Sequence, residues 1–138
     1  FISPELTISR GDQVNNIIER LAILEKQAVD NGFAWPNAEM ILDQIESECQ
    51  EIRDAINQKE CRDRIQEEIG DLLHAAFSLC IFVGFDGQET LTQATNKIEK
   101  RLLTLFKIAR EHGYTDLKNE SIETLMSLWR LAKQHDKR

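Results

Sequence analysis

Two pairs of acidic residues near the middle of the chain have the type and the spacing of ligands for a divalent cation. The members of each pair stand three residues apart, and the second pair follows the first after twenty residues: Glu48 and Glu51, then Glu68 and Asp71. We call these four residues the acidic quartet. The repeat is wider than the acids, because residues 45–55 and 65–75 both begin with isoleucine and end with alanine.

Helical geometry predicts that the quartet gathers in one place. At about 100° per residue, counted from Ile45, Glu48 lies at about 300° and Glu51 at about 240°, while the apolar stripe centres at about 10°. The second pair has the same angles relative to Ile65. Each pair therefore projects from one edge of the apolar face, beside a small alanine. If the two helices pair antiparallel through their stripes, four carboxylates converge on one point.

Four carboxylates at close range repel one another, and partial burial raises the cost of each charge. A divalent cation removes that conflict, and oxygen ligands without histidine or cysteine favour Mg²⁺, with Mn²⁺ as a substitute, over zinc. Magnesium retains positions for water and for substrate phosphate, which suits phosphate-ester chemistry. Acidic residues three apart are also common on solvated helix faces, since charged groups are rarely buried. The matched repeat favours the metal site over that alternative.

Five helical segments are expected to position these residues, because apolar residues recur in them at helical spacing and no alternating strand pattern competes. The segments run from a capping box at Ser9 and Asp12 to Gly32, from Asn37 to a break at 57–59, from there to Gly84, from a capping box at Asp86 and Glu89 to Gly113, and from Ser121 to Lys133. We expect an all-α fold, a helical bundle of four to five helices, in a single domain over residues 1–138.

The apolar stripes of the two acidic segments are expected to form a shared core. The stripes consist of Ile41, Leu42, Ile45, Cys49, Ile52 and Ile56 in the first segment, and of Ile65, Ile69, Leu72, Leu73, Ala76 and Cys80 in the second. Residues 77–85 are apolar nearly all round, which is typical of a buried or interface helix. This pattern indicates self-association.

Composition excludes several classes of function. With 138 residues, 41% hydrophobic and 30% charged, the chain has the composition of one globular domain. A net charge of -7 argues against a nucleic-acid polymer as partner but leaves small phosphorylated ligands open. No run approaches about 18 apolar residues, which argues against a membrane partner. Three cysteines without CxxC spacing, and no visible signal peptide, predict a reduced, cytoplasmic protein.

Further motifs surround the acidic quartet. Residues 32–36 read Gly-Phe-Ala-Trp-Pro, residues 67–73 read Glu-Glu-Ile-Gly-Asp-Leu-Leu, and residues 94–101 read Ala-Thr-Asn-Lys-Ile-Glu-Lys-Arg. Together with Glu-x-x-Glu at 48–51 and the segment 121–133, this combination resembles the MazG family of nucleotide pyrophosphohydrolases, in particular the C-terminal, catalytic half of its bacterial members. The resemblance covers most of the chain.

The resemblance implies Mg²⁺-dependent hydrolysis of nucleoside triphosphates between the α- and β-phosphates, giving a nucleoside monophosphate and pyrophosphate. It implies that the acidic quartet is the catalytic and metal-binding set, and that the chain forms at least a homodimer. The nucleotide-binding residues that it implies are Lys97, Arg101, Trp129, Lys133 and Arg64. Lys97 and Arg101 are four residues apart, and so are Trp129 and Lys133. The residues of each pair therefore share a helix face and can reach one ligand. The physiological role, removal of aberrant nucleotides or control of nucleotide pools, stays open.

Several alternatives remain open at this stage. Ser47 stands where the family often has a glutamate, which predicts altered surroundings for the metal ligands. Without the family, Lys97 and Arg101 are typical of a solvated charged face, and Trp129 is typical of a core or dimer contact. Trp35 either pins its loop or stacks on a base. Three histidines share no ligand spacing and receive no role. The rival functions are a related all-α pyrophosphohydrolase, dUTPase-like or of the phosphoribosyl-ATP type, and a non-catalytic helical interaction module.

Overall fold

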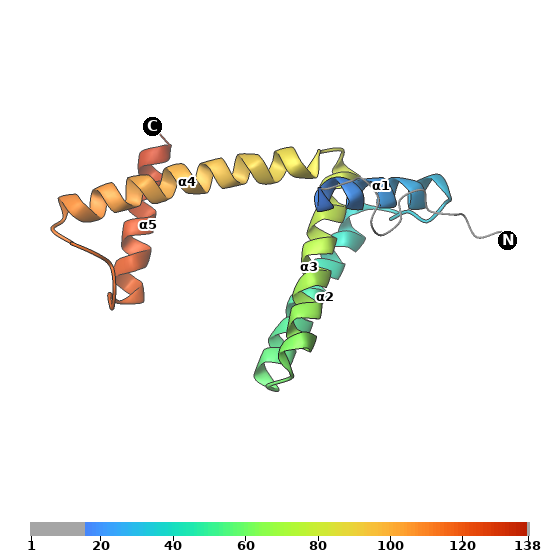
Figure 1. Cartoon of the computed structure of the whole chain (residues 1–138), viewed down its shortest axis with the longest axis horizontal. Coiled ribbons are helices and arrows are strands. Elements are labelled where there is room, and N and C mark those ends of the chain that lie inside the picture. The colour runs from blue at the N-terminus through green and yellow to red at the C-terminus, as the bar shows by residue number, and fades with distance from the viewer. Residues whose placement is uncertain (1–15, 138) are drawn as a thin grey trace. The chain divides into compact units, whose positions relative to one another are not determined.

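The computed structural model describes residues 16–137, most of which lie in five α-helices (Figure 1). The helices are α1 (Ile17–Asp30), α2 (Ala38–Asn57), α3 (Arg62–Val83), α4 (Gly87–Glu111) and α5 (Ile122–Asp136). No strand occurs among the described residues, so the predicted all-α class with five helices is confirmed. In this range no single helix is both long enough and apolar enough to cross a membrane.

The chain divides into two compact units, residues 1–90 and 91–138, and each is described by itself. The first unit contains α1, α2 and α3, and the second contains α5 and all but the first turn of α4. The acidic quartet belongs to the first unit. The basic and aromatic residues implied in nucleotide binding belong to the second, except for Arg64.

The ends of the helices follow local capping chemistry. Side chains of Asn37, Asp86 and Ser121 each accept a hydrogen bond from the backbone N–H three residues later, at 2.9, 2.8 and 3.1 Å. These bonds satisfy N–H groups that have no partner within the helix. Gly84 ends α3 with a φ of 97°, a left-handed conformation that favours glycine. The predicted starts of the second, fourth and fifth segments are confirmed.

The first helix is described from Ile17 onward. Its N-cap is Asn16, whose Oδ1 accepts hydrogen bonds from the backbone N–H groups of Ile18 and Glu19 at 2.9 and 3.3 Å. The capping box predicted at Ser9 and Asp12 lies outside the described residues. The helix ends before Gly32, as predicted, and Gly32 has a φ of 91°.

Helices α2 and α3 form an antiparallel hairpin closed by a short turn, with α2 in cyan and α3 in green (Figure 1). The line of contact between them contains mainly small and acidic residues rather than large apolar ones. Its buried members are Ile41, Glu48 and Ala55 from α2, and Glu68, Ala75 and Ser78 from α3. Those of α2 are seven residues apart, the spacing at which side chains face a neighbouring helix along two turns.

The prediction that α2 and α3 pair through their apolar stripes is confirmed only in part. The stripe residue Ile41 is fully buried in the contact and Ile45 is half-buried, but Leu42, Ile56 and Leu73 are exposed. The physical reason is the width of the side chains in the contact: the alanines let the two backbones approach, while most of the larger residues lie at the flanks. Much of both stripes is therefore not covered by the described part of the chain.

The second unit has a small core of its own between α4 and α5. The core consists of Leu105, Ala109, Leu128 and Ala132, with Ile108, Tyr114, Leu117 and Trp129 packed against it. In contrast, every residue from 91 to 100 in the preceding part of α4 is exposed. The packing of this unit thus fixes the C-terminal half of α4 against α5.

Candidate metal centre

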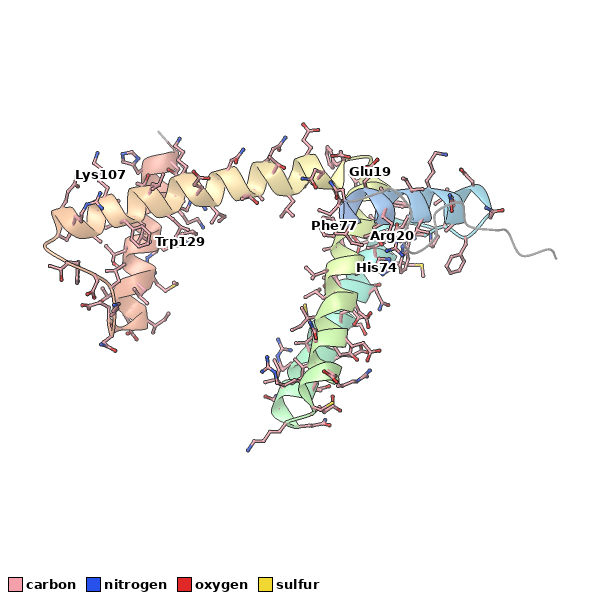
Figure 2. All side chains as sticks on the ribbon, in the orientation of Figure 1. Glu19, Arg20, His74, Phe77, Lys107 and Trp129 are labelled. Atoms are coloured by element: carbon pink, nitrogen blue, oxygen red, sulfur yellow. The ribbon has the colours of Figure 1, made fainter. Side chains whose placement is uncertain are left out.

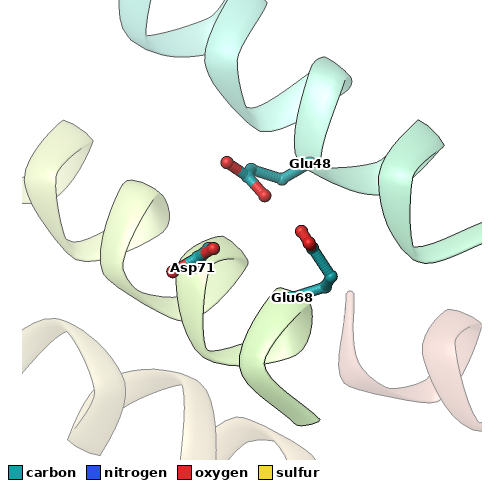
Figure 3. A group of neighbouring side chains, drawn as sticks. All are labelled: Glu48, Glu68 and Asp71. Carbon is teal, nitrogen blue, oxygen red and sulfur yellow. The ribbon is translucent and has the colours of Figure 1, made fainter. Parts of the chain in front are cut away.

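Three members of the acidic quartet converge between α2 and α3. Glu48, Glu68 and Asp71 each offer a carboxylate oxygen, and these oxygens all lie within 4.8 Å of one another. Figure 3 shows Glu48 pointing from α2, and Glu68 from α3, into the space between the two helices, with Asp71 one turn further along α3. The convergence predicted from the repeat is present for three of the four carboxylates, although most of the residues that pair the helices differ from those expected.

Two of these carboxylates are buried to an unusual degree. Only 6% of Glu48 and 3% of Glu68 is exposed, whereas Asp71 is exposed. A buried carboxylate is costly unless its oxygens are paired, and here only half of them are. The Oε2 atoms of Glu48 and Glu68 are buried and have no hydrogen-bond partner among the described residues.

The other oxygen of each buried glutamate accepts a bond from the preceding turn of its own helix. Gln44 donates from Nε2 to Oε1 of Glu48 at 2.6 Å. Arg64 pairs through Nη2 with Oε1 of Glu68, also at 2.6 Å. Each glutamate therefore has one oxygen held by a neighbour and one oxygen left for a further partner.

Glu51, the fourth member, lies at the exposed edge of this group. It falls outside the set of oxygens within 4.8 Å. Hydrogen bonding with Glu48, then with Glu68, and the negative charge of both raise the pKa of Glu51 above its ordinary value. The carboxyl group of Glu51 is thus close enough to interact electrostatically with both buried glutamates, so all four residues of the acidic quartet lie near one another.

The residues present fit a divalent cation. The site offers two buried oxygens without a partner among the described residues, three carboxylates that each place one oxygen within 4.8 Å of the others, and no thiol or imidazole in the group. Such an all-oxygen set is typical of the hard cations Mg²⁺, Mn²⁺ and Ca²⁺. A cation there would supply the missing partner of both buried oxygens.

Arg64 lies beside Glu68, a buried member of the acidic quartet. Besides the close bond to Glu68, its guanidinium is 3.7 Å from Glu67 and 3.9 Å from Glu60, and half of the side chain is exposed. Its role in nucleotide binding, implied by the resemblance, stays a prediction. What the structure shows is contact with a buried carboxylate of the quartet.

The other residues implied in nucleotide binding lie in the second unit. Lys97 and Lys133 are exposed. The Nε atom of Arg101 is 3.1 Å from Oδ2 of Asp136, and both side chains are largely buried. The guanidinium lies 5.4 Å from the ring centroid of Trp129, a residue of α5 that is labelled in Figure 2. Arg101 and Trp129 are thus brought together. The partner Asp136 was not predicted, because nothing in the spacing links residues thirty-five positions apart.

A polar network on α1 and α3 was also missed. Oε1 of Glu25 lies 3.0 Å from Nε2 of His74, which is labelled in Figure 2, and accepts a hydrogen bond from the hydroxyl of Ser78. Glu25, His74 and Trp35 also line an apolar cavity of about 520 Å³. His74 follows Asp71 by three residues on α3. The four-residue spacing of the histidine and the serine was the only signal in the sequence.

Comparison with known proteins adds three findings. A family model described as the MazG nucleotide pyrophosphohydrolase domain matches residues 37–106, which include α2, α3 and most of α4. The chain is 29% identical over 131 residues to the nucleoside triphosphate pyrophosphohydrolase/pyrophosphatase MazG of Thermotoga maritima, covering 93% of this chain and 49% of that protein. It is 25% identical over 114 residues to the nucleoside triphosphate pyrophosphohydrolase of Escherichia coli K12, covering 82% of this chain and 43% of that protein. The chain spans about half the length of the curated relatives that it matches.

Proposed function

The chain belongs to the MazG nucleotide pyrophosphohydrolase family, and from this premise we propose that it hydrolyses nucleoside triphosphates to a nucleoside monophosphate and pyrophosphate. The cofactor that we propose is Mg²⁺, with Mn²⁺ as a substitute. The observation that carries the proposal is the pair of buried, unpartnered glutamate oxygens beside Asp71. The names of the two relatives support the same substrate class.

The acidic quartet divides by exposure into two pairs. Glu48 and Glu68 would hold the ion from the buried side through their free oxygens. Glu51 and Asp71 face solvent, the side from which a charged substrate and water arrive. When bound, the ion supplies Lewis-acid stabilisation of phosphate oxygens and activates water for attack on the α-phosphorus.

Basic residues would bind the triphosphate and offset the charge that builds up on the leaving pyrophosphate. We assign this role to Lys97 and Arg101, with Trp129 and Lys133 as further nucleotide contacts. The ion pair with Asp136 and the stack on Trp129 fix the guanidinium plane of Arg101. A preoriented guanidinium loses little side-chain entropy when it binds phosphate.

We propose that the chain works as a homodimer or a higher homo-oligomer. Large apolar side chains remain exposed on α3, on α4 and in the turn between them, including Leu73, Phe82, Phe85, Leu91 and Ile98. Apolar surface of this extent is typical of an interface between proteins. Light scattering coupled to gel filtration would report a single-chain mass if this proposal is wrong.

We also propose one functional domain over residues 1–138. The family match begins in the first compact unit and ends in the second, so the boundary between the units is not a boundary of the family. The three cysteines are free, which supports a reducing, cytoplasmic setting. The net charge of -7 supports small nucleotides, rather than nucleic-acid polymers or membranes, as partners.

The deciding experiment is a nucleotide panel assayed for pyrophosphate and monophosphate, with and without Mg²⁺. We expect Mg²⁺-dependent release of both products. Glu68→Gln and Asp71→Asn are each expected to lower kcat by at least about a hundredfold, the size typical of losing an electrostatic or metal contact. Far-UV circular dichroism controls for folding. Normal turnover by either variant would contradict the site.

The same panel separates the rival functions. Activity confined to dUTP would identify a dUTPase-like enzyme, and activity only on phosphoribosyl-ATP would identify that type. A non-catalytic interaction module would release no pyrophosphate and would gain no thermal stability from nucleotide with Mg²⁺.

A further inference from the structure

We infer that Gln44 and Arg64 are a matched pair of positioning residues that aim the two buried glutamates at the cation. The inference rests on the proposed metal site and goes beyond it, because it assigns both side chains an action on the ion through a glutamate rather than direct ligation. Each holds one oxygen of a glutamate so that the other oxygen is directed into the site.

The two contacts are equivalent in position and in length. Gln44 precedes Glu48 by four residues, and Arg64 precedes Glu68 by four, so the twenty-residue repeat extends to the donors. Both donors contact Oε1 of their glutamate at 2.6 Å, and in both cases Oε2 is left buried without a partner in the described part of the chain. Four-residue spacing places donor and acceptor on one helix face.

A hydrogen bond at one oxygen restricts rotation of the carboxylate plane. Without it, the side chain of Glu48 would have to lose that freedom when the ion binds, which lowers affinity. Removing a residue that orients a metal ligand in this way typically lowers the metal affinity by about 10- to 100-fold. The bond that Gln44 donates is therefore expected to strengthen metal binding.

The two donors differ in charge, so replacing Gln44 and replacing Arg64 are expected to change the metal affinity differently. Gln44 is neutral and orients Glu48 without changing the charge of the site. Arg64 orients Glu68 but also brings a positive charge, which offsets repulsion within the metal-free quartet and repels an incoming cation. Replacing Arg64 by glutamine keeps a donor of proven reach, since Gln44 already spans four residues, and removes only the charge.

The test is direct binding of Mn²⁺ without nucleotide, followed by electron paramagnetic resonance of the free ion. The chain offers a matched control, because Gln50 donates to Asp54 at 2.8 Å over the same four-residue spacing on exposed α2 surface. We expect Gln44→Leu to weaken Mn²⁺ binding by about 10- to 100-fold. Arg64→Gln is expected to bind at least as tightly as wild type, and Gln50→Leu to match wild type. Circular dichroism and the metal-free Tm monitor folding.

Three results would overturn the inference. Gln44→Leu with wild-type affinity, in a folded protein, would show that the bond does not position Glu48. Arg64→Gln weakened as much as Gln44→Leu would contradict the inference, because the glutamine keeps a donor to Glu68 and removes only a charge that repels the cation. No Mn²⁺ binding by wild type would refute the proposed metal site and this inference with it, whereas the first two results leave the metal site standing.

Discussion

Replacing Glu48 by glutamine is expected to stabilise the metal-free protein while removing its response to metal. The substitution preserves shape and removes one of the negative charges that crowd between α2 and α3. Two unit charges about 5 Å apart interact by about 3 kcal/mol at an effective dielectric constant of about 20. Residual screening and the cation of Arg64 reduce that repulsion, so we expect a gain of about 1–3 kcal/mol in the free energy of unfolding.

The new amide also gives the site a donor that the glutamate lacked. Its N–H groups would face the carboxylate of Glu68, whose Oε2 is buried and has no partner among the described residues. For a chain of this length, 1 kcal/mol corresponds to about 3–5 °C in Tm, so the variant should melt roughly 3–15 °C higher in EDTA.

The assay is thermal unfolding followed by circular dichroism, in EDTA and in saturating Mg²⁺. Wild type should gain stability from Mg²⁺, while Glu48→Gln should gain little because a ligand is missing. Glu46→Gln is the matched control: it removes a charge from an exposed position on the same helix, and we expect a change below about 0.5 kcal/mol. A variant of Glu48 that is less stable than wild type in EDTA, or that Mg²⁺ stabilises fully, would refute the reasoning.

Two further predictions concern pH and the second unit. The raised pKa of Glu51 means that the metal-free fold binds a proton there more tightly than the unfolded chain does, so this contribution to stability is present at low pH and is lost as pH rises through the raised pKa. The gain in Tm from Mg²⁺ should therefore be larger near neutral pH than near pH 5, and equal gains at the two pH values would contradict this. Asp136→Ala leaves the largely buried Arg101 without its carboxylate and should cost about 1–3 kcal/mol in chemical denaturation. Unchanged stability would show that solvent replaces the ion pair.

Helix positions and the convergence of the acids were predictable because both follow from local rules. Caps such as Asn37 and Asp86 act within one turn, and the helical period fixes which residues share a face. The twenty-residue repeat then placed Glu48 and Glu68 at equivalent positions on two helices. A short turn between them leaves antiparallel pairing as the simple arrangement.

Which face pairs the helices was only partly predictable from hydrophobicity, as the buried stripe residue Ile41 shows. The apolar stripe was expected to form the contact, but Ala55 and Ala75 allow a closer approach, and the acids between them become buried. A hydrophobic pattern indicates which side chains are buried. It does not indicate whether a second helix of the same chain or another molecule covers them.

Polar contacts between residues far apart in the sequence could not be predicted from residue spacing either. The contact of Glu25 with His74 joins residues forty-nine positions apart, and that of Arg101 with Asp136 joins residues thirty-five apart. Local rules cannot select such partners, because any exposed acid is a candidate for each base. The donors on the buried glutamates were within reach of the rules, since Gln44 and Arg64 obey the four-residue spacing.

The hairpin of α2 and α3 also bears on how the protein folds. The acidic quartet lies between residues 48 and 71, in two helices joined by a tight turn, so it is assembled by contacts of low sequence separation alone. Loop closure over so short a stretch has a small entropic cost and is fast. The acidic quartet is complete once this hairpin has closed. An ion that binds at that moment would stabilise the hairpin while α4 and α5 are still being synthesised.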